Sequence, residues 1–207
     1  MGGSHSLFVD KAGRLHTCGS ARLGSPVLGH ALEPDADPDF LHKIGPPTPV
    51  PSMQRRIVCV ASSYAHCLAL SAEGEVYAWG SGDDGVLGHG DEISRAVPSR
   101  IETLSRIESI ATGPRVCAAV NAEGRLFTWG ADSFLDDADE ELPNGLGYEL
   151  DPTTTCQLTP KSVDALSQER VVGVALGSAF TLVVTDAGGA VFSFGYSKDG
   201  ALGHGSI

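Results

Sequence analysis

Residues Tyr77 to Glu92 contain the spacing Gly-x-Gly-x-x-Gly, at Gly80, Gly82 and Gly85, which cradles a pyrophosphate in dinucleotide-binding proteins. That chemistry needs a helix directly after the glycines, because the free N–H groups and dipole of its first turn hold the phosphates. Residues 86–90 contain two more glycines, and this composition disfavours a helix. We therefore predict that the glycines occupy turns and that the chain binds no cofactor.

Histidines are the second group of residues that could do chemistry, since imidazoles bind metals and transfer protons. His30, His89 and His204 each follow a Leu-Gly pair in a repeated pattern, so each is expected in a different structural unit and unable to share an ion. We expect these three to make structural hydrogen bonds. His5 and His66 begin predicted strands, where we expect them to bond to backbone groups.

The five cysteines (Cys18, Cys59, Cys67, Cys117 and Cys156) are an odd number without a Cys-x-x-Cys pair. Their places in mostly apolar runs predict buried free thiols in a reducing compartment. No Ser-His-Asp, Cys-His, paired-carboxylate or phosphate-loop arrangement stands apart from the repeated pattern. The sequence thus predicts neither a catalytic residue nor a metal site.

An acidic insertion at residues 131–144 is the strongest candidate for binding. It lies where Gly130 and Gly145 are fifteen positions apart, whereas Gly80 and Gly85 are five apart. A loop longer than the fold requires needs a separate explanation, and this one could be a solvated, partly disordered loop or a docking site for a basic partner. Calcium is disfavoured, because the acids lack the alternate spacing and glycine of a helix-loop-helix site. The candidate partner-binding residues are Asp132, Phe134, Asp136, Asp137, Asp139, Glu140 and Glu141. A second acidic insertion spans residues 31–45.

Composition limits the remaining functions. The net charge of −12 disfavours direct binding to nucleic acid or anionic lipid, which needs clustered lysine and arginine. No apolar run approaches the roughly 18 to 20 residues of a membrane span, and the N-terminus lacks the features of a secretory signal. We expect an intracellular chain, cytoplasmic or nuclear.

The elements that position these residues repeat four times. Each copy has an apolar run, a turn with a late glycine and a second run that ends in glycine, which predicts a β-hairpin. In the second runs small or branched residues alternate with aromatic ones, so both faces of each sheet should be covered by neighbouring sheets. The repeated structural positions include Gly74, Trp79, Gly80, Gly88, Gly124, Trp129, Gly130, Gly195 and Gly203.

Two further strands are expected in each period. A Leu-Gly pair follows every hairpin; after the first three pairs come a Pro-x-x-aliphatic strand and an apolar run. Four short strands in about 50 residues are the unit of a β-propeller blade, which buries its apolar faces only against the next blade. The sequence therefore predicts one all-β domain over residues 1–207, an incomplete propeller of three and a half to four four-stranded blades. The approximate repeats are 2–46, 47–97, 98–159 and 160–207.

The pattern Gly-x-x-His, apolar strand, glycine turn, Val-Tyr-x-Trp-Gly, Leu-Gly-His-Gly, Pro-x-x-Val closely resembles the repeat of the regulator of chromosome condensation family. The resemblance covers essentially the whole chain and implies a seven-bladed propeller that commonly binds protein partners through its faces. The chain departs from the pattern where Cys18 and Phe194 replace tryptophan, where Val116 and Phe180 replace histidine, and at Tyr148.

Seven blades need roughly 350 residues, so this chain accounts for part of a ring. We expect either further blades from elsewhere or self-association. The predicted function is a non-catalytic interaction module that presents loops to a protein partner. The alternative, which the family's founding member suggests, is guanine-nucleotide exchange on a Ran-like small GTPase, although no exchange residue can be transferred to this sequence.

Overall fold

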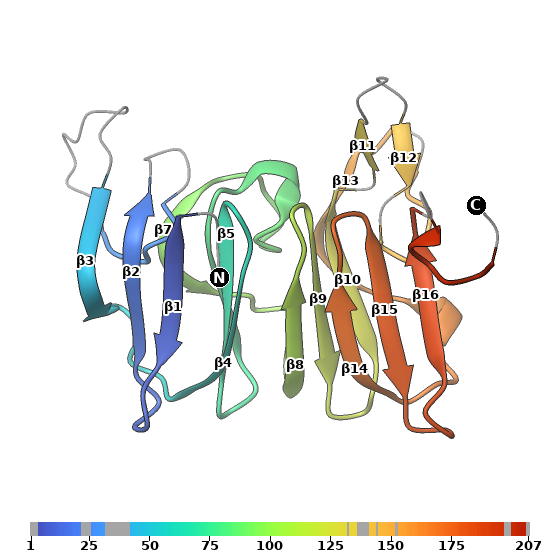
Figure 1. Cartoon of the computed structure of the whole chain (residues 1–207), viewed down its shortest axis with the longest axis horizontal. Helices are drawn as coiled ribbons and strands as arrows, with labels where there is room; N and C mark the ends of the chain where they lie inside the picture. The colour runs from blue at the N-terminus through green and yellow to red at the C-terminus, as the bar shows by residue number, and fades with distance from the viewer. Residues whose placement is uncertain are drawn as a thin grey trace.

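The computed structural model describes residues 4–21, 26–31, 42–131, 133–135, 141–143, 145–151, 153–196 and 200–205. These residues form four antiparallel sheets, blades 1 to 4, which stand side by side in sequence order (Figure 1). Blade 1 contains β1 (His5–Val9), β2 (Leu15–Ala21) and β3 (His42–Pro49), and blade 2 contains β4 (Ile57–Ser62), β5 (His66–Ser71), β6 (Val76–Gly80) and β7 (Arg95–Arg100). Blade 3 contains β8 (Ile107–Thr112), β9 (Val116–Asn121), β10 (Leu126–Ala131) and β13 (Cys156–Ser162), and blade 4 contains β14 (Val171–Leu176), β15 (Phe180–Thr185) and β16 (Val191–Gly195).

Four short elements complete the described structure. They are the 3-10 helices η1 (Asp83–Gly85) and η2 (Asp164–Leu166) and the two-stranded sheet of β11 (Ser133–Leu135) and β12 (Glu141–Pro143). Among the described residues no helix has the length and apolar character needed to cross a membrane.

Each predicted hairpin is present, and its closing glycine shows why that residue is required. In blade 2 the register pairs His66 with Gly80, and Gly80 has a φ of +112°. A Cβ at this position would overlap the carbonyl oxygen of Ala65. Both constraints select glycine. Gly80 was predicted to lie in a turn, but it is the last residue of β6, next to a bulge in the pairing with β7.

The core lies between the blades. Trp79 and Tyr77 pack with apolar residues of blade 1, while Val76 and Ala78 on the opposite side of β6 pack with residues of blade 3. A third cluster joins blade 3 to blade 4. The predicted division into an aromatic side and a small or branched side, each covered by a neighbouring sheet, is therefore confirmed for blades 2 and 3.

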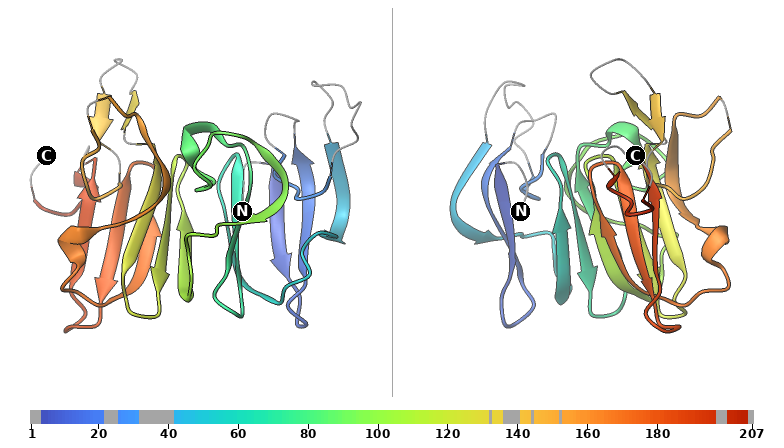
Figure 2. Two further views of the ribbon diagram at one scale, coloured as in Figure 1. Left: turned by 180° about the vertical axis from the view of Figure 1, so that it is seen from behind. Right: turned by 45° about the vertical axis from the view of Figure 1, so that its right-hand side comes forward.

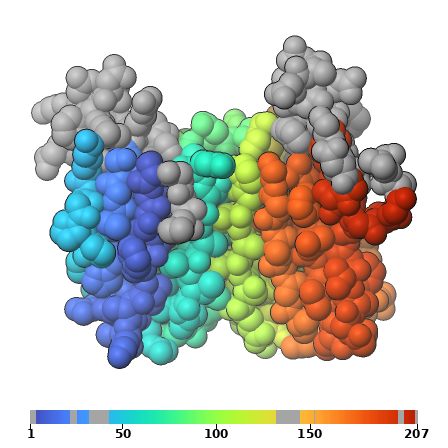
Figure 3. All heavy atoms as spheres, in the orientation of Figure 1, coloured from blue at the N-terminus to red at the C-terminus, as the bar shows by residue number. Residues whose placement is uncertain are grey.

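The blades form part of an unclosed ring. The first strand of blade 3, β8, contacts both β4 and β14, the first strands of its neighbours (Figure 2). In the space-filling view the blades appear as successive bands from blue to red (Figure 3). Blade 4 has no described neighbour beyond it, and Val191 is consequently 66% exposed, whereas its blade 2 counterpart Val76 is fully buried.

Candidate functional site

Most of the polar residues that the repeat supplies connect one blade to the next. The indole Nε1 of Trp79 donates to the carbonyl of Val27 at 2.9 Å, and that of Trp129 donates to the carbonyl of Val86 at 2.8 Å. Each ring lies against the glycine of the preceding blade's Leu-Gly pair. At Gly88 a Cβ would stand 2.9 Å from Nε1 of Trp129. These tryptophans and glycines therefore form contacts between blades.

The histidines that begin the hairpins lie beside cysteine thiols of the next blade, partners that the sequence did not suggest. His66 Nε2 lies 3.2 Å from Sγ of Cys117 in blade 3, and His5 Nε2 lies 3.3 Å from Sγ of Cys67 in blade 2. Burial lowers the pKa of His66 to about 4 and raises the pKa of Cys117. Both groups are therefore neutral at pH 7. A nucleophilic cysteine needs the opposite shift, so the pair is structural.

Sequence reasoning missed this Cys–His contact because it crosses a blade boundary. The signal was present, since a cysteine follows the strand-start position at both Cys67 and Cys117. The five cysteines are free thiols, as predicted, but only these two are buried. Cys59 is exposed on β4 and the other two are half-buried, so burial was predicted wrongly for three of the five.

The Leu-Gly histidines make local hydrogen bonds. His30 Nε2 lies 3.2 Å from the hydroxyl of Thr17, and His204 Nε2 lies 2.8 Å from the hydroxyl of Ser193. Burial, followed by the nearby charge of Arg95, lowers the pKa of His89. Within the part of the chain that the structure describes, no group of three or more histidine, cysteine, aspartate or glutamate side chains could hold a metal ion.

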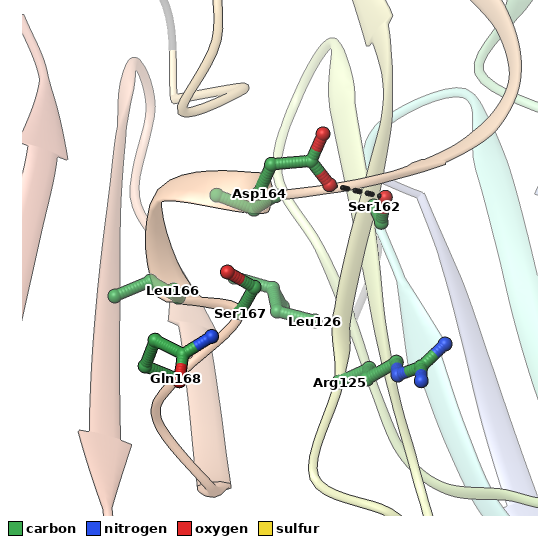
Figure 4. Close-up of a pocket in the computed structure, with 8 residues that line it drawn as sticks. Arg125, Leu126, Ser162, Asp164, Leu166, Ser167 and Gln168 are labelled. Carbon is green, nitrogen blue, oxygen red and sulfur yellow. Dashed lines mark hydrogen bonds between the residues drawn. The ribbon is translucent and has the colours of Figure 1, made fainter.

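One cavity of about 340 Å³ lies beside the β9–β10 turn and η2 (Figure 4). The segment from Val163 to Val171 is two residues longer than its counterpart from Ile101 to Ile107, and this longer link forms one wall. The Ser162 hydroxyl donates to the Asp164 carboxylate at 2.7 Å, but the lining contains no imidazole or thiol to act with that pair. The cavity is lined by Arg125, Leu126, Ser162, Val163, Asp164, Leu166, Ser167 and Gln168.

The acidic insertions occupy equivalent connections. Residues 22–41 join β2 to β3, and residues 132–155 join β10 to β13. β1, β2 and β3 are equivalent to the second, third and fourth strands of blade 2, so both insertions follow the third strand position of a blade. Both therefore leave the sheets at the same edge, where β11 and β12 project from blade 3 (Figure 1). The backbone of Phe134 pairs with that of Leu142, so this insertion begins and ends as a short hairpin. Asp132, Asp136, Asp137, Asp139 and Glu140 lie outside the described residues, whereas Glu141 begins β12.

Two family models described as the regulator of chromosome condensation (RCC1) repeat match the chain, at residues 73–120 and 57–86. The E3 ubiquitin-protein ligase HERC2 of Mus musculus is 39% identical over 209 residues; the alignment includes 99% of this chain and 4% of that protein. The chain thus spans a small part of the relative it matches.

Two solved structures share the fold. Human WBSCR16 superposes with a TM-score of 0.75 at 21% identity, over 100% of this chain and 49% of the other. Prp20p of Saccharomyces cerevisiae superposes with a TM-score of 0.71 at 22% identity, over 93% of this chain and 41% of the other. The Prp20p structure was described together with its binding properties to Gsp1p and histones.

Proposed function

Because this chain belongs to the regulator of chromosome condensation repeat family, we propose that it is a non-catalytic protein-interaction module that presents the loops of one edge to a protein partner. The observation that carries this proposal is the position of the two acidic insertions. Both lie in connections that follow the third strand of a blade, whereas repeat residues such as Trp129 and His66 are occupied in contacts between blades. Binding specificity is then encoded in the connections, which the fold leaves free to vary.

The insertion of blade 3 is the part of this proposal that is most directly testable. We expect a version lacking residues 132–141 to lose protein partners that the intact chain captures, because the acids of this segment attract basic surfaces. A matched control keeps the length and replaces only the carboxylates by Asn or Gln. Loss of the same partners from both variants supports a charge-based contact; identical partner sets for all three proteins would remove the insertion from the binding surface.

A second candidate function is guanine-nucleotide exchange on a Ran-like GTPase. It is favoured by the shared fold with Prp20p, whose description includes binding to Gsp1p. Exchange requires contact with the GTPase and no covalent chemistry, so the absence of a catalytic constellation among the described residues does not argue against it. Fluorescent GDP bound to such a GTPase should be released faster in the presence of the chain. Release at the spontaneous rate would reject exchange by this chain and leave the interaction module standing.

A further inference from the structure

The acidic residues of this chain are concentrated, in the sequence, in the connections that follow the third strand of each blade. The connections that leave each blade after its third strand, residues 22–41, 81–94, 132–155 and 196–207, are here called the loop edge. They contain 17 acidic and two basic residues, a formal charge of −15, while the rest of the chain contains nine acidic and 12 basic residues, a formal charge of +3. The net negative charge of the protein therefore belongs to these connections. Two of their acids are paired with arginines just outside the counted residues: Asp91 with Arg95 at 2.9 Å and Asp84 with Arg115 at 2.7 Å.

Charges at the opposite edge are largely paired. Glu75 accepts from Arg55 at 3.2 Å and from Arg100 at 3.1 Å, and Arg170 lies 3.4 Å from Asp186. Altogether five of the nine acidic residues outside the loop edge are paired with an arginine. These pairs satisfy the charges within the protein, so they leave little excess potential to attract a partner.

Two large apolar side chains of blade 2 are exposed here: Ile93 in the loop edge itself, and Tyr64 in the β4–β5 turn, which lies beside residues 81–82 of the loop edge. Tyr64 is 76% exposed and Ile93 is 65% exposed. The Ser81 N–H donates to the carbonyl of Ala65, the neighbour of Tyr64, and a Cβ at Gly82 would stand 2.5 Å from the carbonyl carbon of Ile93. The two apolar residues thus flank the segment Ser81-Gly82 from different turns.

Both turns are held by hydrogen bonds. The N–H of Ile93 donates to the Asp91 carboxylate at 3.0 Å, and its carbonyl accepts from Arg95 at 2.8 Å. The Ser63 N–H closes the turn around Tyr64 by donating to the carbonyl of His66 at 2.9 Å. Fixed turns reduce the entropy that binding would cost, and exposed tyrosine on a fixed backbone is typical of an interface anchor.

We propose that Tyr64 and Ile93 form the anchor of the loop edge for a basic segment of a protein partner, in which lysine or arginine residues flank an apolar side chain. This inference rests on the proposed function and names the partner's chemistry. The apolar side chain contacts Tyr64 and Ile93, while the flanking cations face the surrounding acids, among them Asp83 and Glu92. Charge complementarity selects this occupant, since a formal charge of −15 repels nucleic acid, anionic lipid and acidic peptides.

The test uses three synthetic peptides of equal length and the intact chain. The first alternates lysine with leucine, the second replaces every leucine by serine, and the third replaces every lysine by glutamate. Fluorescence anisotropy at low salt should give the lysine–leucine peptide an affinity about tenfold higher than the lysine–serine peptide, because only the former reaches the apolar anchor. The glutamate peptide should not bind.

Two double variants locate the site. Tyr64→Ser with Ile93→Ser should reduce the affinity for the lysine–leucine peptide to that for the lysine–serine peptide. Val58→Ser with Val172→Ser is the matched control, because these valines are 50% and 53% exposed on the first strands of blades 2 and 4, away from the loop edge. It should bind like the intact chain. Circular dichroism checks that both variants fold.

Three results would overturn the inference: equal affinity for the two lysine peptides, unchanged binding by the Tyr64/Ile93 variant, or equal loss in the valine control. These outcomes are distinct from failure of the proposed function. A protein partner that the intact chain and the Tyr64/Ile93 variant capture equally well would leave the interaction module intact and reject the anchor. Absence of any specific protein partner would reject the module itself.

Discussion

Replacing Trp129 by phenylalanine tests the hydrogen bond that connects blade 3 to blade 2. The indole is fully buried, and its Nε1 donates to the carbonyl of Val86 at 2.8 Å. Without this donor the buried carbonyl loses a partner at a cost of about 1–3 kcal/mol. The smaller ring leaves a cavity that adds about 1 kcal/mol. We expect the free energy of unfolding to fall by about 2–4 kcal/mol.

Blade 4 suggests how the loss can be partly reversed. Phe194 replaces tryptophan there, and the equivalent carbonyl, that of Gly145, accepts a hydrogen bond from the Thr181 hydroxyl at 2.6 Å. Cys117 is the blade 3 counterpart of Thr181. In the double variant Trp129→Phe, Cys117→Thr the new hydroxyl should donate to the carbonyl of Val86. We expect it to recover about 1 kcal/mol relative to the sum of the single changes.

Urea unfolding followed by circular dichroism measures these differences. Trp79 is the only tryptophan left in the variants, so its fluorescence reports separately on the contact between blades 1 and 2. Cys117→Thr alone completes the double-mutant cycle. A loss below 0.5 kcal/mol for Trp129→Phe, or strict additivity of the two changes, would refute the account of this contact.

Three further predictions concern stability. Burial lowers the pKa of His66 to about 4, so below pH 6.5 the unfolded chain binds a proton that the folded chain does not. The free energy of unfolding should therefore fall by about 3 kcal/mol between pH 6.5 and pH 4. Urea titrations at several pH values should show a flatter dependence for His66→Gln. Gly188→Ala adds a Cβ in open space at a φ of +73° and should lower the free energy of unfolding by about 1 kcal/mol. Gly124→Ala should lower it more, because at a φ of +79° its new Cβ would also stand 3.0 Å from the backbone of blade 4. Equal shifts in the melting temperature of the two variants would contradict the steric argument. The ion pair of Arg115 with Asp84, at 2.7 Å, joins partly exposed side chains, so Arg115→Gln should cost no more than about 1 kcal/mol, and a larger loss in chemical denaturation would show that solvent screens the pair less than we expect.

The blades could be predicted from sequence because their determinants are local and repeated. Period-two alternation in residues such as Val76 and Tyr77 assigns the two sides of a strand, and a glycine after the aromatic position indicates where the hairpin closes. The same locality explains what was missed. Contacts such as His66 with Cys117 join residues 51 positions apart in different blades, so no short sequence window contains both partners. Cys59 lies on β4, a strand at the edge of its sheet, and the order of strands within a sheet is not apparent from a short sequence window.

The candidate binding surface could be predicted only in part. An insertion is visible as extra length, and its charge can be counted, so the segment around Asp132 stands out in the sequence and remains a predicted partner site. Tyr64 and Ile93 do not stand out, because single apolar residues are common in turns and their exposure follows from the way two separate turns meet at Gly82. Sequence therefore indicates the edge but not the side chains that could anchor a ligand on it.

The two edges of the ring face different physical constraints. The hairpin edge, opposite the loop edge, is formed by the turns of the hairpins. A Cβ added at Gly74 or Gly124 in these turns would stand 3.0 Å from the backbone of the next blade, so a substitution there must change how the blades stack. At the loop edge the connections differ in length from blade to blade while the sheets remain alike. We therefore expect stability and recognition to be separable in this fold. Changes at the hairpin edge should alter unfolding and leave binding intact, whereas changes at Tyr64 or Ile93 should do the reverse.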